Sequence, residues 1–121
     1  MLIDFVLTAH ISLPNVTFDN LPATMNRKIV NDILIEELGF KGIVITDALD
    51  MHAISKYYTE EEIVKNTMNA GVDILLMPDN VDKMYNTFLK LVQDGEISEE
   101  RVNTSVRKII DVKLKRGIIS K

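Results

Sequence analysis

The sequence contains no cysteine, no tryptophan and no long uninterrupted apolar segment. Without cysteine, disulfides and thiolate metal sites are excluded, and the composition is compatible with a reducing cytoplasm. No apolar run approaches the roughly 18 residues that a membrane span needs. The apolar N-terminal residues lack a basic region and are interrupted by Asp4, so we expect no signal peptide. These absences predict a soluble, cytoplasmic protein that is not bound to a membrane.

Clustered basic residues are also missing. The formal net charge is −4, from 18 acidic residues against 14 lysines and arginines. A nucleic-acid-binding surface normally shows a basic patch, so we expect no nucleic-acid partner. The hydrophobic fraction of 46% and the length of 121 residues are ordinary for one small globular domain. We therefore expect a single domain over residues 1–121.

Three short, almost continuous apolar runs predict buried parallel strands, because strands covered on both faces need such runs. They lie near residues 4–11, 42–47 and 73–77. Apolar residues at helical spacing predict helices near residues 22–38, 59–70, 80–94 and 98–116. Thr59 and Glu62 form a capping-box pattern at the start of the second helix.

This order of elements predicts an α/β fold, either an open doubly wound sheet or part of a (β/α) barrel. About three parallel strands with flanking helices and two C-terminal helices fit a partial TIM barrel. Three strands make a narrow sheet whose apolar edges favour further pairing. We expect either a piece of something larger or a chain that completes itself by association.

Polar residues follow each predicted strand, at the ends where parallel α/β folds carry their functional groups. Asp47 comes directly after the run "GIVIT", where an ionised acid without partners would be costly. From the residues alone, a catalytic or binding role and a role in a turn have equal weight for Asp47. Asp50 is more simply a helix cap or a solvated loop acid.

The sequence contains two histidines. His10 follows the first predicted strand and is most simply a hydrogen-bonded core histidine, whereas His52 fits a surface position. Both could join Asp47 in a metal site, but histidines without close helical spacing are weak evidence for one. We expect no metal and no cofactor. Glycine-rich phosphate loops, the Gly-x-Ser-x-Gly elbow and the His-Glu-x-x-His motif are all missing.

Four segments, in order, resemble the barrel domain of glycoside hydrolase family 3, especially its bacterial β-N-acetylhexosaminidase branch. They read "LTAHISLPNV", "PATMNRKIVNDILIEELGFKGIVITDALDMHAI", "AGVDILLMP" and "DGEISEERVNTSVRKIIDVKLKRG". The resemblance covers nearly the whole chain and is most specific at "EELGFKGIVITDALDM". It implies that the three strands are the sixth to eighth of the barrel and that the last two helices close it.

The resemblance implies that Asp47 is the nucleophile of a retaining glycosidase that removes terminal β-linked N-acetylglucosamine, as in cell-wall muropeptide recycling. We expect His10 and Met51 to bind substrate as pocket-lining residues. The family branch carries its acid/base His–Asp pair and a "KHFPGHG"-like sugar-binding segment after earlier strands, and neither matches this sequence. A full barrel takes roughly 200 residues or more.

We therefore expect the chain alone to be weakly active or inactive, with the missing N-terminal part of the barrel or a second copy of itself as partner. Two alternatives have other functions. A non-catalytic α/β module could oligomerise through its strand edges. A receiver-like phospho-acceptor domain would need an acidic pair after the first strand and a lysine after the last, where this chain has "TAH" and "MPDN".

Overall fold

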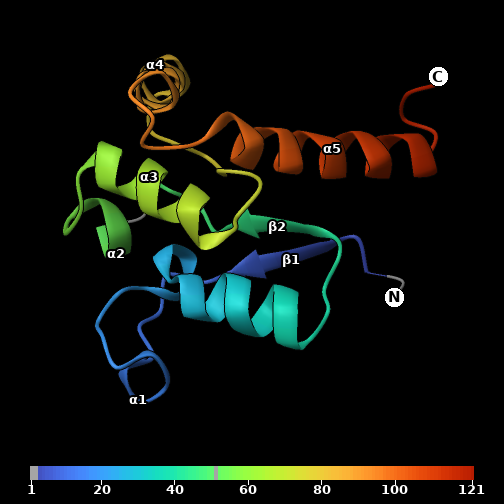
Figure 1. The fold of residues 1–121 in the computed structure, drawn as a ribbon. Coiled ribbons are helices and arrows are strands. Elements are labelled where there is room, and N and C mark those ends of the chain that lie inside the picture. The colour runs from blue at the N-terminus through green and yellow to red at the C-terminus, as the bar shows by residue number, and fades with distance from the viewer. Residues whose placement is uncertain (1–2, 51) are drawn as a thin grey trace.

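The computed structural model describes residues 3–50 and 52–121. Two strands, β1 (Phe5–Thr8) and β2 (Ile43–Thr46), lie side by side near the centre of the molecule (Figure 1). The helices are α1 (Pro14–Thr17), η1 (Ala23–Met25), η2 (Lys28–Glu37), α2 (His52–Ser55), α3 (Glu60–Ala70), α4 (Val81–Gln93) and α5 (Glu99–Lys115). In Figure 1, η2 lies on one side of the strands and α5 on the other.

The two strands are parallel, with Phe5 opposite Ile43 and Thr8 opposite Thr46. Because side chains alternate along a strand, Val6 and Val44 face the same way and pack against buried Val30 of η2. A second apolar cluster lies between η1, α3 and α4 and includes Met25, Ile54, Val64, Met84 and Ile97. The result is an α/β fold with two parallel strands and several helices.

The third strand predicted over residues 73–77 is not a strand. This segment meets β2 only through an isolated parallel bridge between Ile45 and Ile74. Two backbone hydrogen bonds make that bridge, from Thr46 N to Ile74 O at 3.0 Å and from Ile74 N to Val44 O at 3.2 Å. The sheet of the described residues therefore has two strands and a bridged third segment.

Side chains explain why the pairing of residues 73–77 with β2 stops after one bridge. On one side of it, the N–H of Val44 donates to the Asp73 carboxylate at 2.9 Å instead of to a backbone carbonyl. On the other side, the N–H of Leu76 donates to the Thr46 hydroxyl at 2.9 Å. Because both positions are taken by side chains, the regular pairing of a parallel strand cannot continue.

The first strand and first helix are also shorter than predicted. Beyond Thr8 the chain turns to residues 22–24, with an antiparallel bridge between Ser12 and Pro22, so the strand predicted over residues 4–11 ends early. The helix predicted over residues 22–38 is split into η1 and the wider-wound η2. Asn26 divides them because its backbone is extended and its side-chain oxygen accepts from Lys28 N at 3.0 Å.

The helices α3, α4 and α5 lie within one residue of their predicted limits at each end. The capping box at the start of α3 is confirmed, since Glu62 N donates to the Thr59 hydroxyl and Thr59 N to the Glu62 carboxylate. Gly71 ends this helix with a φ of 115°, a conformation that favours glycine. The four-residue helices α1 and α2 were not predicted, because elements this short leave no periodic pattern.

A buried carboxylate fixes α5 to the sheet. Asp73 accepts hydrogen bonds from Val44 N at 2.9 Å and from the Ser105 hydroxyl at 2.6 Å. Lys108 and Arg101, also on α5, place cationic nitrogens 3.3 and 3.8 Å from its two oxygens. Because the Asp73 side chain has no exposed surface, these partners supply the compensation that a buried charge requires.

Arg101 extends this network to the end of α3. Its guanidinium donates to Met68 O at 2.6 Å, to Val72 O at 2.7 Å and to the Ser105 hydroxyl at 2.7 Å. Burial lowers the pKa of Arg101, and the charge of Asp73 opposes that effect. The Arg101 side chain therefore holds together the end of α3, the start of the bridged segment and α5.

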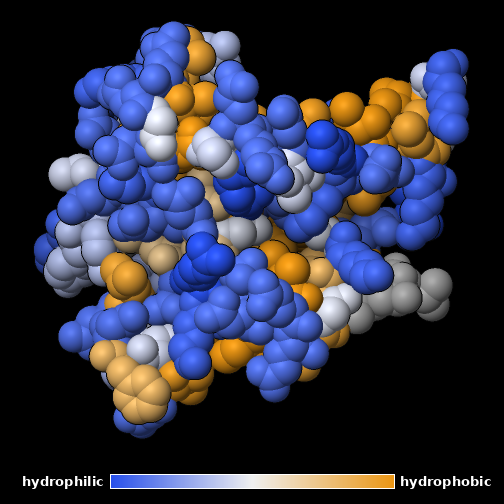
Figure 2. Space-filling model, in the orientation of Figure 1, coloured by the Kyte–Doolittle hydropathy of each residue, from blue (hydrophilic) through white to orange (hydrophobic). Residues whose placement is uncertain are grey.

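Exposed apolar side chains gather over α1 and along α5 on the face shown in Figure 2. Those within α1 and on either side of it are Ile11, Leu13, Val16 and Phe18, and those on α5 include Val106 and Ile110. On the open side of β1, Phe5 and Leu7 are 46% and 54% exposed. No helix in the described part of the chain is long and apolar enough to cross a bilayer.

Candidate active site at the end of β2

Asp47 is placed by the strand that precedes it. β2 is buried along most of its length and ends at Thr46, whose side chain is fully buried. Asp47 N donates to Thr8 O at 3.0 Å, which continues the pairing of the two parallel strands by one residue. The carboxylate therefore sits at the carboxyl end of the sheet, on a rigid element.

The turn that carries Asp47 is held by an unbroken series of hydrogen bonds. The N–H donors and their acceptors are Thr46 to Ile74 O (3.0 Å), Asp47 to Thr8 O (3.0 Å), Ala48 to Asp47 Oδ1 (2.8 Å), Leu49 to Leu76 O (2.9 Å) and Asp50 to Met77 O (3.1 Å). Three of these acceptors belong to the bridged segment and one belongs to β1. The turn is thus fixed from both sides.

Asp47 is partly exposed at the end of this turn. Its Oδ1 accepts the Ala48 N–H at 2.8 Å, a contact that orients the carboxylate. Among the backbone groups of residues 3–50 and 52–121 and the side chains of residues 3–50 and 54–121, none donates a hydrogen bond to Oδ2 of Asp47. A carboxylate on a rigid support, with one oxygen not held by the described donors, can act as a nucleophile or as a general base.

His10 lies beside this turn, but both of its ring nitrogens already have protein partners. Nδ1 is 3.0 Å from the hydroxyl oxygen of Thr24, and Nε2 is 2.9 Å from the carbonyl oxygen of Ala48. The structure thus brings His10 and Asp47 together through Ala48. The interpretation of His10 as a hydrogen-bonded histidine describes these contacts. Its expected role as a pocket-lining residue stays a prediction.

Thr24 is a residue that sequence reasoning missed. It is fully buried in η1 and links three segments, since its hydroxyl also lies 3.0 Å from Ala9 O and 3.3 Å from the hydroxyl of Thr8. The sequence pattern predicts a regular helix at Thr24, and a threonine in a helix gives no indication of a role in a site. Its partners are 14, 15 and 16 residues away, so no local pattern could have found it.

The other candidates are less informative. Met51 lies outside the described residues, and His52 begins α2. Asp50 is exposed, as expected of a solvated loop acid. Among the residues that the structure describes, no three His, Asp or Glu side chains come together as metal ligands would.

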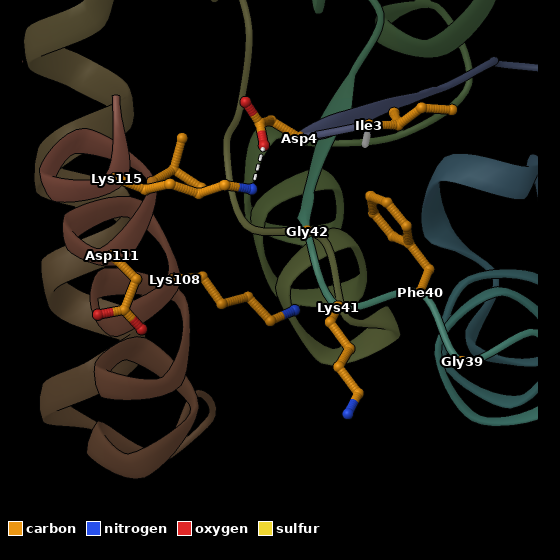
Figure 3. Close-up of a pocket in the computed structure, with 10 residues that line it drawn as sticks. Ile3, Asp4, Gly39, Phe40, Lys41, Gly42, Lys108, Asp111 and Lys115 are labelled. Carbon is orange, nitrogen blue, oxygen red and sulfur yellow. Dashed lines mark hydrogen bonds and ion pairs between the residues drawn. The ribbon is translucent and has the colours of Figure 1, made fainter. Parts of the chain in front are cut away.

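A large cavity lies at the other end of the strands. It has a volume of about 650 Å³, and its lining includes Asp4 before β1, Gly42 before β2, and Lys108 and Lys115 of α5 (Figure 3). Gly42 allows the chain to pass close here, because a Cβ atom at this position would come within 2.5 Å of Asp4 O. Since Asp47 follows the opposite end of β2, this cavity is separate from the candidate site.

Comparison with known proteins identifies the family. A family model described as "Glycosyl hydrolase family 3 N terminal domain" matches residues 2–112. The chain belongs to glycosyl hydrolase family 3. The predicted family is therefore confirmed, and the two parallel strands are consistent with a portion of its N-terminal barrel domain.

Relatives with known names support the same branch of family 3. Beta-hexosaminidase A of Pseudoalteromonas piscicida is 32% identical over 129 residues, which cover 91% of this chain and 22% of the relative. The beta-N-acetylglucosaminidase/beta-glucosidase of Cellulomonas fimi is 28% identical, over 93% of this chain and 22% of the relative. The chain therefore spans less than a quarter of these two proteins.

Solved structures of family 3 enzymes share the arrangement. The beta-N-acetylglucosaminidase from Thermotoga maritima is 40% identical with a TM-score of 0.83, and the match covers 88% of this chain and 24% of that one. The family 3 beta-N-acetylglucosaminidase from Paenibacillus sp. str. FPU-7 is 37% identical with a TM-score of 0.87, over 96% of this chain and 23% of that one. These likenesses concern the portion of the fold that this chain provides.

Proposed function

We propose that this chain provides the nucleophile-bearing part of a retaining β-N-acetylglucosaminidase and that Asp47 is the nucleophile. The observation that carries the proposal is the position of Asp47 at the carboxyl end of β2, on a turn whose five N–H groups are all hydrogen-bonded. The names of the family 3 relatives and solved structures support the substrate, a terminal β-linked N-acetylglucosamine.

The proposed reaction has two displacements. Asp47 Oδ2 attacks the anomeric carbon, the bond from that carbon to the aglycone oxygen breaks, and the leaving oxygen takes a proton from a general acid. A water molecule then attacks the same carbon, gives up a proton, and releases the sugar from the restored carboxylate. The Ala48 N–H at Oδ1 holds the carboxylate in place through both steps.

The proposal assigns proton transfer to a group outside this chain. Without assisted protonation, turnover typically falls by about 10²–10⁴-fold, and an incomplete sugar pocket lowers it further. The proposed partner is the remaining part of the barrel or, for the chain alone, a second copy that covers the exposed side of β1 at Phe5 and Leu7. The cytoplasmic location also stays a prediction.

A chimeric enzyme tests the proposed function. This chain replaces the matching 23% of the Paenibacillus enzyme, and release of the chromophore from a chromogenic N-acetylglucosaminide is measured. We expect turnover by the chimera, a loss of about 10⁴-fold or more in Asp47→Asn, and little change in the matched variant Asp50→Asn. A folded chimera that keeps its turnover in Asp47→Asn contradicts the proposal.

The isolated chain provides the complementary measurement. We expect turnover of the same substrate at least about 10²-fold below that of the chimera, because the general acid is missing. Robust turnover by the chain alone that is abolished in Asp47→Asn would keep Asp47 as nucleophile but would show that the proton donor lies within this chain.

A further inference from the structure

The ring of His10 joins two segments that meet at the candidate active site. Its Nε2 lies 2.9 Å from the carbonyl oxygen of Ala48, directly after Asp47, and its Nδ1 lies 3.0 Å from the hydroxyl of buried Thr24. Both ring nitrogens are therefore used within the protein. A histidine that binds a sugar hydroxyl through nitrogen would need one of them free.

The partners determine where the ring carries its hydrogen. A carbonyl oxygen can only accept, so Nε2 must be the protonated nitrogen that donates to Ala48. In the neutral ring, Nδ1 then accepts the hydroxyl hydrogen of Thr24. In the charged ring, Nδ1 donates to Thr24, whose hydroxyl hydrogen turns to Ala9 O at 3.0 Å. The bond to Ala48 is the same in both forms.

The Ala48 carbonyl belongs to a peptide group that is held on both sides. Its oxygen accepts from His10, and the N–H of the same peptide group, which belongs to Leu49, donates to Leu76 O at 2.9 Å. The preceding peptide group carries the N–H that holds Asp47 Oδ1. The two peptide groups share the Cα atom of Ala48, so a shift of Ala48 after loss of the His10 bond would move the donor that orients the carboxylate.

We infer that His10 is a positioning residue whose Nε2–H holds the Ala48 carbonyl and thereby orients Asp47, instead of a residue that contacts the sugar. Its importance for catalysis rests on the proposed function, but the hydrogen bond itself does not. Thr24 has the supporting role of fixing the ring plane from the other nitrogen. The sequence pattern "TAH" supplies the ring, and η1 supplies the hydroxyl that orients it.

Nuclear magnetic resonance of the isolated chain tests the hydrogen bond directly. The long-range couplings of the ring nitrogens report the tautomer at alkaline pH, where a histidine ring is neutral. The signals of His10 are identified as those missing from His10→Gln. We expect the Nε2–H form. A neutral ring that carries its hydrogen on Nδ1 overturns the inference.

Two variants then separate positioning from packing. The amide of Gln places a donor near the former Nε2, whereas the shorter amide of Asn reaches only the Thr24 side. We expect amide hydrogen exchange at Ala48 and Leu49 to be about tenfold faster in His10→Asn than in His10→Gln, the equivalent of one hydrogen bond. Global stability should differ little between them. Equal exchange at these two amides in both variants overturns the inference.

The outcomes are distinct from those of the proposed function. An inactive chimera with an Nε2–H ring contradicts the glycosidase proposal and leaves the hydrogen bond in place. An active chimera with an Nδ1–H ring contradicts the positioning role and leaves Asp47 as nucleophile.

Discussion

At the scale of single residues, side chains take over hydrogen bonds that a regular sheet would assign to the backbone. Thr46 accepts the N–H of Leu76 through its hydroxyl, and the next residue carries the carboxylate of the candidate site. Because Thr46 is fully buried, no water molecule can take the place of the Leu76 N–H at its hydroxyl. The turn around Asp47 therefore depends on a threonine hydroxyl.

Substitution of Thr46 by Val tests this dependence. The two side chains have similar shapes, but Val leaves the Leu76 N–H without its acceptor, so we expect the free energy of unfolding to fall by about 1–3 kcal/mol. Urea denaturation of the isolated chain measures the change. Thr46→Ser is the matched control, because it keeps the hydroxyl. A Val variant as stable as the wild type would show that the hydroxyl contributes nothing.

At the scale of elements, α5 is joined to the sheet by the buried carboxylate of Asp73. Removing the carboxylate leaves the Val44 N–H without its acceptor and two cationic side chains of α5 without their counter-charge. Both cations keep some contact with solvent, with exposed fractions of 18% and 22%, which reduces the penalty of leaving them unpaired.

We therefore expect Asp73→Ala to lower the free energy of unfolding by about 2–4 kcal/mol. Asp111→Asn, an exposed acid on the same helix, serves as the control and should change stability by less than about 0.5 kcal/mol. Thermal or urea unfolding of the isolated chain gives both values. Similar losses in the two variants would contradict the role of Asp73.

How much could be predicted differs between elements for a physical reason. The capping box of Thr59 and Glu62 lies within four residues, so the sequence contains all of its partners. The break at Asn26 depends on partners elsewhere in the fold. So does the point at which residues 73–77 stop pairing with β2, since Leu76 is 30 residues from Thr46. The strand-end position of Asp47 could be predicted because the apolar run before it is visible in the sequence. The contact of His10 with Thr24 could not be predicted, because it depends on the fold.

At the scale of the whole molecule, the two ends of the described chain are connected by charge. Asp4, just before β1, accepts from Arg116 Nε at 2.6 Å and lies 3.4 Å from Lys115 Nζ. The hydrogen bond from Arg116 lowers the pKa of Asp4, and the same contact raises the pKa of Arg116. This contact connects the C-terminal end of α5 to the start of the sheet.

The lowered pKa of Asp4 predicts how stability changes with acidity. Its contribution is fully present above the ordinary aspartate value of 3.8 and is lost as the pH falls through the lower value of the folded state. We expect the thermal midpoint of Asp4→Asn to lie below that of the wild type at neutral pH and to approach it in strong acid. Added salt should reduce the difference. A difference that grows in acid would contradict this assignment.

The exposed side of β1 predicts association of the isolated chain. Phe5 and Leu7 expose apolar surface on the sheet face opposite Val6, next to the unpaired edge of β1, and both features favour contact with a second copy. Light scattering should give a mass of at least two chains, and replacing Phe5 and Leu7 by Thr should shift it toward one chain. A wild-type chain that behaves as a monomer at high concentration would contradict the expected self-association.

The central claim is that Asp47 forms the covalent bond to the sugar. The most direct test treats the chimera with 2-acetamido-2-deoxy-5-fluoro-β-glucosyl fluoride, whose fluoride leaves without a general acid and whose ring fluorine slows release of the sugar from the enzyme. Intact mass and peptide mapping then locate the label. We predict one sugar on Asp47 and none in Asp47→Asn. A label on another residue, or one that persists in Asp47→Asn, would contradict the account.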